Sequence, residues 1–244
     1  MSAIANGPVA VMLQHEMKYL INSGQREFLL PILEEHLPID RYGRSSVASL
    51  YYDTPDQRLI RASVEKPVFK EKIRLRSYGR ATDTSPVFLE IKRKLSGVVY
   101  KRRVQTTVLQ AEAFFRGDDT IGGNEQIVRE LTYFRDYYGS LIPACLIVSE
   151  RSAYVEPDGA LRVTIDEAPR YRTDNLTLTG PLDGQPLLAE GESILEIKAQ
   201  QAIPLWLASA LSEGDMYRRG FSKYGAAYHQ IISEKLPERI AFYV

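Results

Sequence analysis

Short stretches in which apolar and polar residues alternate recur along most of the chain. Alternation with a period of two indicates a β-strand with one buried face, because successive side chains point to opposite sides of a sheet. Turn sequences such as Ser96-Gly97 and Pro157-Asp158-Gly159 separate some of the stretches and predict tight antiparallel hairpins. The predicted strands are His15–Ile21, Val47–Asp53, Val68–Tyr78, Val87–Lys94, Val98–Val104, Ile147–Val155, Leu161–Glu167 and Ser193–Ala199.

Helical signals are fewer than strand signals. They consist of capping residues, a proline suited to a first helical position, and apolar residues spaced three or four apart. Four helices are predicted: Ser23–His36, a helix capped by Asn124 that runs to Tyr138, a helix from Pro204 to near Gly214, and Ser222–Leu236. In the first of them, Pro31 would introduce a kink or mark a later start. The segment Arg170–Ala189 has no clear period and is predicted to be a long connection.

Charged residues inside the predicted strands fall mostly on one face. Residues two apart share a face, and on this face twelve basic residues accompany four acidic ones, Glu16, Glu90, Asp166 and Glu196. The excess of eight positive charges contrasts with the whole chain, in which 31 Lys and Arg balance 31 Asp and Glu. The basic residues are Lys18, Lys70, Lys72, Arg74, Arg76, Lys92, Lys94, Lys101, Arg103, Arg151, Arg162 and Lys198.

A one-sided cationic face is typical of a surface that an anion neutralises, because like charges on neighbouring strands repel one another. A solvated sheet face is the alternative, but such a face should mix both signs. If the sheet closes into a barrel with helices over its apolar face, the cations line a channel that focuses their field on an anionic ligand. The arginines favour phosphate oxygens, which the guanidinium group can bind bidentately.

The acidic residues on this face would repel phosphate unless a divalent cation lies between them. Mg²⁺ or Mn²⁺ is commonly held by one or two carboxylates together with substrate phosphates. Glu196 and Glu90 are therefore the candidate metal ligands, followed by Glu16 and Asp166. The alternative for each carboxylate is an ion pair that orients a neighbouring lysine or arginine.

Other kinds of site are excluded by composition and motifs. Cys145 is the only cysteine, so the chain has neither an intramolecular disulfide nor a Cys-based zinc site, and its apolar surroundings predict burial. No P-loop, GxGxxG, HExxH or Gly-x-Ser-x-Gly motif is present. The zero net charge and the single short basic run at 101–103 argue against nucleic-acid binding.

The length and hydropathy of the chain predict one soluble, cytoplasmic domain over residues 1–244. The hydrophobic share of 44% is enough for a sizeable core. No run of 18 apolar residues predicts a membrane span, and the first residues lack the pattern of a secretory signal.

Nine short motifs occur in an order that resembles the VTC domain. This is the catalytic domain of the vacuolar transporter chaperone complex and of its bacterial relatives, within the triphosphate tunnel metalloenzyme (CYTH-like) superfamily. The resemblance extends from about residue 14 to about residue 228. The motifs are Glu16-x-Lys18-Tyr19, Ser49-Leu50-Tyr51-Tyr52-Asp53-Thr54, Lys72-Ile73-Arg74-Leu75-Arg76-x-Tyr78-Gly79, Leu89-Glu90-Ile91-Lys92, Lys101-x-Arg103, Arg151-x-Ala153-Tyr154, Leu161-Arg162-Val163-Thr164-Ile165-Asp166, Leu195-Glu196-Ile197-Lys198 and Phe221-Ser222-Lys223-Tyr224.

The resemblance implies an α+β fold, an eight-stranded antiparallel β-tunnel flanked by helices. It also implies a metal-dependent phosphotransferase that moves the terminal phosphate of ATP onto polyphosphate, with Mn²⁺ or Mg²⁺ as cofactor. We expect the catalytic cations to be Lys18, Arg74, Arg76, Lys92, Arg151, Arg162 and Lys198. Further substrate contacts are expected from Tyr51, Lys72, Lys101, Arg103, Ser222 and Lys223, and metal binding from Glu196, Glu90 and Glu16.

Two positions depart from the family pattern. The wider tunnel family has Glu-x-Glu-x-Lys on its first strand, and here the first glutamate is replaced by Gln14. Some polymerases have a lysine directly before Phe-Ser-Lys, where this chain has Gly220 preceded by Arg218 and Arg219. A triphosphate hydrolase and a polyphosphate-binding module without turnover therefore stay open as alternatives. Expected ligands are ATP, polyphosphate or another polyanion, and export of a product would need a membrane partner protein.

Overall fold

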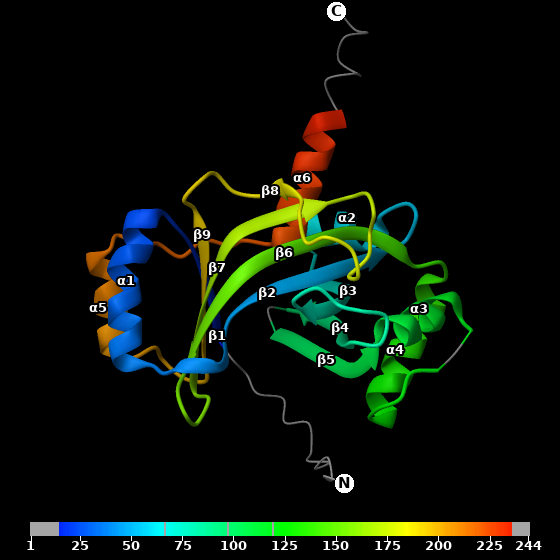
Figure 1. The fold of residues 1–244 in the computed structure, drawn as a ribbon, viewed down its shortest axis with the longest axis horizontal. Helices are drawn as coiled ribbons and strands as arrows, with labels where there is room; N and C mark the ends of the chain where they lie inside the picture. Colours follow the sequence, from blue (N-terminus) through cyan, green and yellow to red (C-terminus); the bar gives the residue numbers. More distant parts are fainter. Residues whose placement is uncertain (1–14, 66, 97, 119, 236–244) are drawn as a thin grey trace, which may run out of the picture.

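An antiparallel sheet forms the centre of the molecule, and helices cover much of its surface (Figure 1). The computed structural model describes residues 15–65, 67–96, 98–118 and 120–235. Gln14, Gly97 and Leu236, which enter the sequence predictions, lie outside these ranges. The strands are β1 (His15–Ile21), β2 (Ile39–Asp53), β3 (Phe69–Tyr78), β4 (Pro86–Leu95), β5 (Val98–Thr107), β6 (Ile142–Val155), β7 (Leu161–Arg172), β8 (Gln185–Pro186) and β9 (Ser193–Ala199).

All eight predicted strands are present, and several are longer than predicted. They follow the order β1-β9-β7-β6-β2-β3-β4-β5, and the two-residue strand β8 pairs with β7. The predicted connection at Arg170–Ala189 is wrong in part, because β7 continues to Arg172 and pairs there with both β6 and β8. The predicted hairpin between β6 and β7 is confirmed, and Gly159 in its turn has a φ of 74°, which favours glycine.

Six helices accompany the sheet in the described part of the chain, and four of them were predicted. They are α1 (Ser23–His36), α2 (Arg58–Val64), α3 (Val108–Arg116), α4 (Glu125–Tyr138), α5 (Leu205–Glu213) and α6 (Lys223–Lys235). Pro31 lies inside α1, whose first turn is capped by a capping box formed by Asn22 and Gln25. The prediction missed α2 and α3, although Thr107 and Gln110 form a capping box at the start of α3.

The apolar face of the sheet is buried in two separate clusters on either side of the molecule. Helices α1 and α5 cover β1, β9 and β7, where Leu29, Leu33 and Leu207 meet Val163 and Ile197 (Figure 1). Helices α3 and α4 cover strands β2 to β5 on the other side (Figure 1). Because helices cover the apolar face, the charged face of the same strands points to the opposite side of the sheet.

The sheet curls around its charged face to form an open-sided tunnel. The ammonium group of Lys92 on β4 lies 3.3 Å from the carboxylate of Glu16 on β1, although five strands separate β4 from β1 in the sheet. These side chains can meet only if the sheet bends toward the face that carries them. Hydrogen bonds do not close the barrel between β1 and β5 in the described strands, so the α+β tunnel architecture is confirmed in an open form.

Candidate functional site

The concave side of the curled sheet, called the inner face, gathers most of the charged residues that the sequence assigned to one strand face. Register confirms that they share this face, because Lys72 lies opposite Lys92, Arg74 opposite Glu90, and Lys92 opposite Lys101. Strands β7, β9 and β1 continue it, with Lys198 opposite both Arg162 and Glu16. The inner face comprises Glu16, Lys18, Lys72, Arg74, Arg76, Glu90, Lys92, Lys101, Arg151, Arg162, Thr164, Asp166, Glu196 and Lys198.

Glu90 is the centre of the first cluster on the inner face. Its carboxylate lies 2.7 Å from Arg74, 3.9 Å from Arg76 and 2.6 Å from Lys101. Burial alone would raise the pKa of Glu90, but these three cations hold it well below its ordinary value. Because its oxygens already face three cations, the arrangement favours an ion-pair role for Glu90 over the metal-binding role expected from the sequence.

Hydroxyl groups fix the two arginines of this cluster. Arg74 donates a hydrogen bond of 2.9 Å to the hydroxyl of Tyr51, and Arg76 donates one of 3.3 Å to Ser49. Arg76 is only 9% exposed. A guanidinium group that is buried and held by fixed partners loses little conformational freedom when it binds an anion, so these arginines are preorganised for phosphate.

Asp166 is the centre of the second cluster and joins the sheet to α6. Arg151 binds its two oxygens at 2.6 and 2.7 Å, and Lys223 at the start of α6 also contacts it. Lys223 donates a further hydrogen bond of 3.0 Å to Ser149. Burial alone would raise the pKa of Asp166, but Lys223 and Arg151 keep it well below its ordinary range.

Helix α6 reaches the inner face through its first turn. Ser222 accepts a hydrogen bond of 3.0 Å from Lys72. Tyr224 stacks on Tyr51 with ring centroids 4.5 Å apart and donates a hydrogen bond to the buried carboxylate of Asp53. These contacts anchor the first turn, so the sequence-predicted pair formed by Ser222 and Lys223 lies at the same site as the strand cations.

Glu196 and Glu16 form the third cluster, on β9 and β1. Both carboxylates bind Lys18, at 3.1 Å and 3.2 Å respectively, and Glu196 also binds Lys198 at 2.7 Å. Burial alone would raise the pKa of Glu196, but Lys198 and Lys18 keep it well below its ordinary value. The two carboxylates thus converge on one ammonium group. This arrangement suits a divalent cation, which commonly uses one or two carboxylates and completes its shell with phosphate oxygens.

A complete protein cage for a metal is not formed by the described residues, since no three His, Cys, Asp or Glu side chains there form a group suited to an ion. Any ion at Glu16 and Glu196 would therefore take further ligands from the substrate or from water. Of the three metal ligands expected from the sequence, the structure brings together these two and leaves Glu90 among arginines.

The remaining predicted residues lie toward the margin of the inner face. Arg162 pairs with Asp40 at 2.6 Å and its side chain is 38% exposed. Arg103 lies over the ring of Phe88, at 4.8 Å from its centroid. Both are on the strand face expected from the sequence, but neither shares a carboxylate with the clusters described above.

Sequence reasoning did not single out several polar groups that the fold brings to this site. Ser49 and Ser149 hold Arg76 and Lys223, and Asp40 pairs with Arg162. The hydroxyl of Thr164 is buried on the inner face and finds no hydrogen-bond partner within the described residues, so it is available to a ligand. The sequence could have indicated Thr164, because its spacing of two residues from Arg162 and from Asp166 places it on this face. The contacts of Ser49, Ser149 and Asp40 have no local signal in the sequence.

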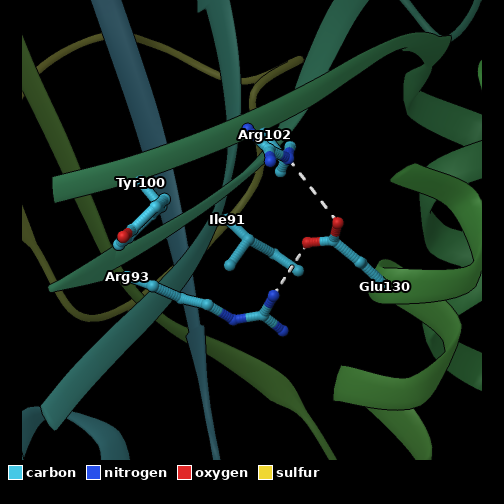
Figure 2. A pocket seen from close by; sticks show the side chains of 5 residues that line it. All are labelled: Ile91, Arg93, Tyr100, Arg102 and Glu130. Atoms are coloured by element: carbon cyan, nitrogen blue, oxygen red, sulfur yellow. Dashed lines mark hydrogen bonds and ion pairs between the residues drawn. The ribbon is translucent and has the colours of Figure 1, made fainter. Parts of the chain in front are cut away.

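Arginines on the opposite face of the same strands serve packing instead. Arg93 on β4 and Arg102 on β5 both pair with Glu130 of α4, at 2.8 and 3.5 Å, beside Ile91 and Tyr100 (Figure 2). These residues line a small hollow on the outer side, where the carboxylate ties the helix to the sheet. Cations at alternate positions of these strands therefore have different roles: those on the outer face bind α4, and those on the inner face line the tunnel.

The inner face has lysines with altered acidity. Burial, followed by repulsion from Lys70 and Lys92, lowers the pKa of Lys72 to about 7. Burial likewise lowers the pKa of Lys101 to about 7, against the opposing effect of Glu90. Burial and the neighbouring cations together disfavour the charged form of Lys72, which a bound anion would stabilise.

Comparison with known proteins agrees with this geometry. The family model described as VTC domain matches residues 13–232, which is most of the chain. The chain belongs to the VTC domain family. No curated protein matches its sequence at a significant level.

Two solved structures share the fold of this VTC domain at low sequence identity. One is a proposed adenylate cyclase from Bacillus halodurans, with a TM-score of 0.55 and 12% identity, covering 86% of this chain and 96% of the other. The second is a proposed adenylate cyclase from Vibrio parahaemolyticus, with a TM-score of 0.52 and 12% identity, covering 89% and 98%. At such identity the likeness concerns the fold.

Membership of the VTC domain family supports an enzyme that acts on polyphosphate or a triphosphate. None of the helices in the described part of the chain combines the length and apolar character that a membrane crossing requires.

Proposed function

We propose that this VTC domain is a polyphosphate polymerase that uses a nucleoside triphosphate such as ATP. The observation that carries the proposal is the cationic inner face of the open-sided tunnel, where cations of the strands and of the first turn of α6 come together. In the reaction, a terminal oxygen of the polyphosphate chain bonds to the γ-phosphorus of the nucleotide. The bond from that phosphorus to the β–γ bridging oxygen breaks, and the nucleoside diphosphate leaves.

The residues of the inner face would perform this transfer by positioning and charge neutralisation. Phosphoryl transfer needs an in-line arrangement of the attacking and leaving oxygens and stabilisation of charge on the equatorial oxygens. Arg74 and Arg76 are rigid enough to orient a phosphate, and Arg151 and Lys223 face it from β6 and α6. The low exposure of these groups strengthens their interaction with the reacting phosphates.

A divalent ion such as Mn²⁺ or Mg²⁺ would be held by Glu196 and Glu16. When bound, it would supply positive charge to phosphate oxygens that the lysines and arginines do not reach. Lys18, which contacts both carboxylates, would then be released toward the phosphates. The carboxylates of Glu90 and Asp166 would continue to orient their arginines.

Incubation of the protein with ATP and Mn²⁺ tests the proposal. We expect long phosphate chains, visible on a gel, together with release of ADP in an equal amount to the phosphate transferred. The matched control is the same incubation with ADP, which lacks the γ-phosphate. Release of free phosphate without chains would show a triphosphate hydrolase, in which water is the acceptor, and tight binding without turnover would show a binding module.

The pKa of Lys72 leads to a prediction for the pH dependence of binding. In the free protein Lys72 loses its charge as the pH rises through about 7, and a bound polyanion raises this pKa, so binding takes up a proton. Affinity for tripolyphosphate should therefore fall with rising pH, by roughly tenfold between about pH 7 and pH 9. Calorimetry in two buffers of different ionisation enthalpy would measure the proton uptake directly.

A control variant distinguishes Lys72 from the other titrating groups. Burial also lowers the pKa of Lys101 to about 7 and that of Lys223 to about 8, so both titrate in the same range as Lys72. The variant Lys72→Gln should bind more weakly near pH 7 and lose the part of the pH dependence that Lys72 contributes. An unchanged slope in this variant would contradict the role of Lys72.

A further inference from the structure

Three aromatic side chains from neighbouring strands meet at one end of the inner face. Tyr42 of β2 stacks on Tyr78 of β3 with an interplanar angle of 9° and ring centroids 5.9 Å apart. Tyr78 meets Phe88 of β4 edge to face at 6.0 Å. Tyr42 is 57% exposed and Tyr78 is 44% exposed. We call Tyr42, Tyr78 and Phe88 the aromatic rim.

The rim continues the phosphate-facing row of the inner face. Tyr78 follows Arg76 by two residues on β3 and so shares its face, and Phe88 lies directly opposite Arg76 on β4. At the other end of β3, Lys72 contacts Ser222 beside α6. Tyr78 is six positions after Lys72, which corresponds to about 20 Å along the strand. Helix α6 therefore occupies the end of the row that is remote from the rim.

Cations flank the rim on both sides. The guanidinium group of Arg41 lies 4.6 Å from the centroid of the Tyr42 ring, and that of Arg103 lies 4.8 Å from the centroid of the Phe88 ring. Asp40 accepts a hydrogen bond from the backbone of Tyr42 while it pairs with Arg162. Arg41 and Arg103 thus place positive charge beside two of the three rings.

We propose that the aromatic rim is the binding site for the base of the nucleoside triphosphate. The inference rests on the proposed function and assigns the base to one end of the tunnel. With the base on the rim, the phosphates extend toward Arg76 and Arg74, and the γ-phosphate points along the row toward α6. An aromatic surface that adjoins a cationic groove binds nucleotides by stacking, and because every base has a π-face, such a site tolerates different bases.

The test compares two ligands that share the triphosphate and differ in the base. Calorimetry would give the dissociation constants of ATP and of tripolyphosphate for the wild type, Tyr78→Leu and Tyr78→Phe. We expect Tyr78→Leu to bind ATP about tenfold more weakly with little change for tripolyphosphate, because only stacking is lost. Tyr78→Phe keeps the ring and should bind both ligands as the wild type does.

A fluorescent nucleotide gives a direct readout of stacking. The triphosphate of 2-aminopurine riboside should be quenched on binding to the wild type and to Tyr78→Phe, and less quenched by Tyr78→Leu. The matched control is Tyr133→Leu, which removes an exposed tyrosine from α4 on the outer side of the sheet. It should leave both dissociation constants and the quenching unchanged.

The outcomes separate the rim from the proposed function. Equal weakening of ATP and tripolyphosphate by Tyr78→Leu would show that the rim only supports the phosphate-binding cations, and this would overturn the base site. Unchanged binding of both ligands by Tyr78→Leu would show that the base binds elsewhere, and this would also overturn the base site. A wild-type protein that binds neither ligand would overturn the proposed function, and the base site with it.

Discussion

Replacement of both Arg74 and Arg76 by alanine is expected to weaken the binding of tripolyphosphate by more than about 100-fold. A hydrogen bond to a charged group contributes roughly 1.5–3 kcal/mol, and each 1.4 kcal/mol corresponds to about tenfold in affinity. Both side chains are enclosed on the inner face, and Tyr51 and Ser49 hold them in position. The loss should therefore exceed that expected for surface charges. Isothermal titration calorimetry measures it directly.

Two controls separate lost contacts from lost charge and lost structure. The double variant Arg116→Ala/Arg129→Ala removes two exposed arginines from α3 and α4, and it should bind tripolyphosphate almost as well as the wild type. The double variant Arg74→Lys/Arg76→Lys keeps the charge near Glu90 but lacks the bidentate guanidinium group, so an intermediate affinity is expected. Tight binding by the double alanine variant would move the phosphate site away from strand β3.

The second large effect is expected from Glu196→Gln, which should abolish turnover while tripolyphosphate binding persists. The amide keeps the shape of the side chain and one acceptor for Lys18 or Lys198, but it lacks the charge that a divalent cation requires. Binding of the anion should be unchanged or tighter, because one repelling carboxylate is gone and the cations remain. Paired measurements of activity and binding, with Mn²⁺ titrated, test both parts of the prediction.

The same substitution at two other carboxylates provides the comparison. Glu16 shares Lys18 with Glu196, so Glu16→Gln should raise the Mn²⁺ concentration needed for activity. Glu90→Gln should instead weaken anion binding, because Arg74, Arg76 and Lys101 would lose the carboxylate that orients them. Near-normal activity of Glu196→Gln with an unchanged metal requirement would refute the assignment of the metal to Glu196.

The acidic residues of the inner face explain how so many cations coexist in the free protein. Glu90, Asp166, Glu196 and Glu16 each contact two or three cations, and together they offset part of the repulsion. Burial and repulsion from Lys70 and Lys92 still lower the pKa of Lys72, so its charged form remains disfavoured without an anion. A polyanion would therefore bind to a surface that is already arranged for it and still carries unbalanced charge.

The amino-acid sequence by itself determined the strands and the chemistry of the face they share. A period of two in Phe69–Tyr78 assigns Lys72, Arg74 and Arg76 to one side and Ile73 and Leu75 to the other, whatever the rest of the fold. Parity is a local property of an extended chain, and for this reason the cationic face was predicted correctly. Helices α1 and α4 were predicted from local signals as well, whereas α3 was missed although it also has a capping box.

Only the tertiary structure decided which charges meet. Glu16 and Lys92 are 76 residues apart and lie on strands far apart in the sheet, so their contact depends on how far the sheet curls. The docking of α6 brings Lys223 to Asp166, and the pairing of the neighbouring strands β2, β3 and β4 brings Tyr42, Tyr78 and Phe88 together. How far the sheet curls and where α6 docks depend on packing between distant parts of the chain, and no local pattern in the sequence carries that information.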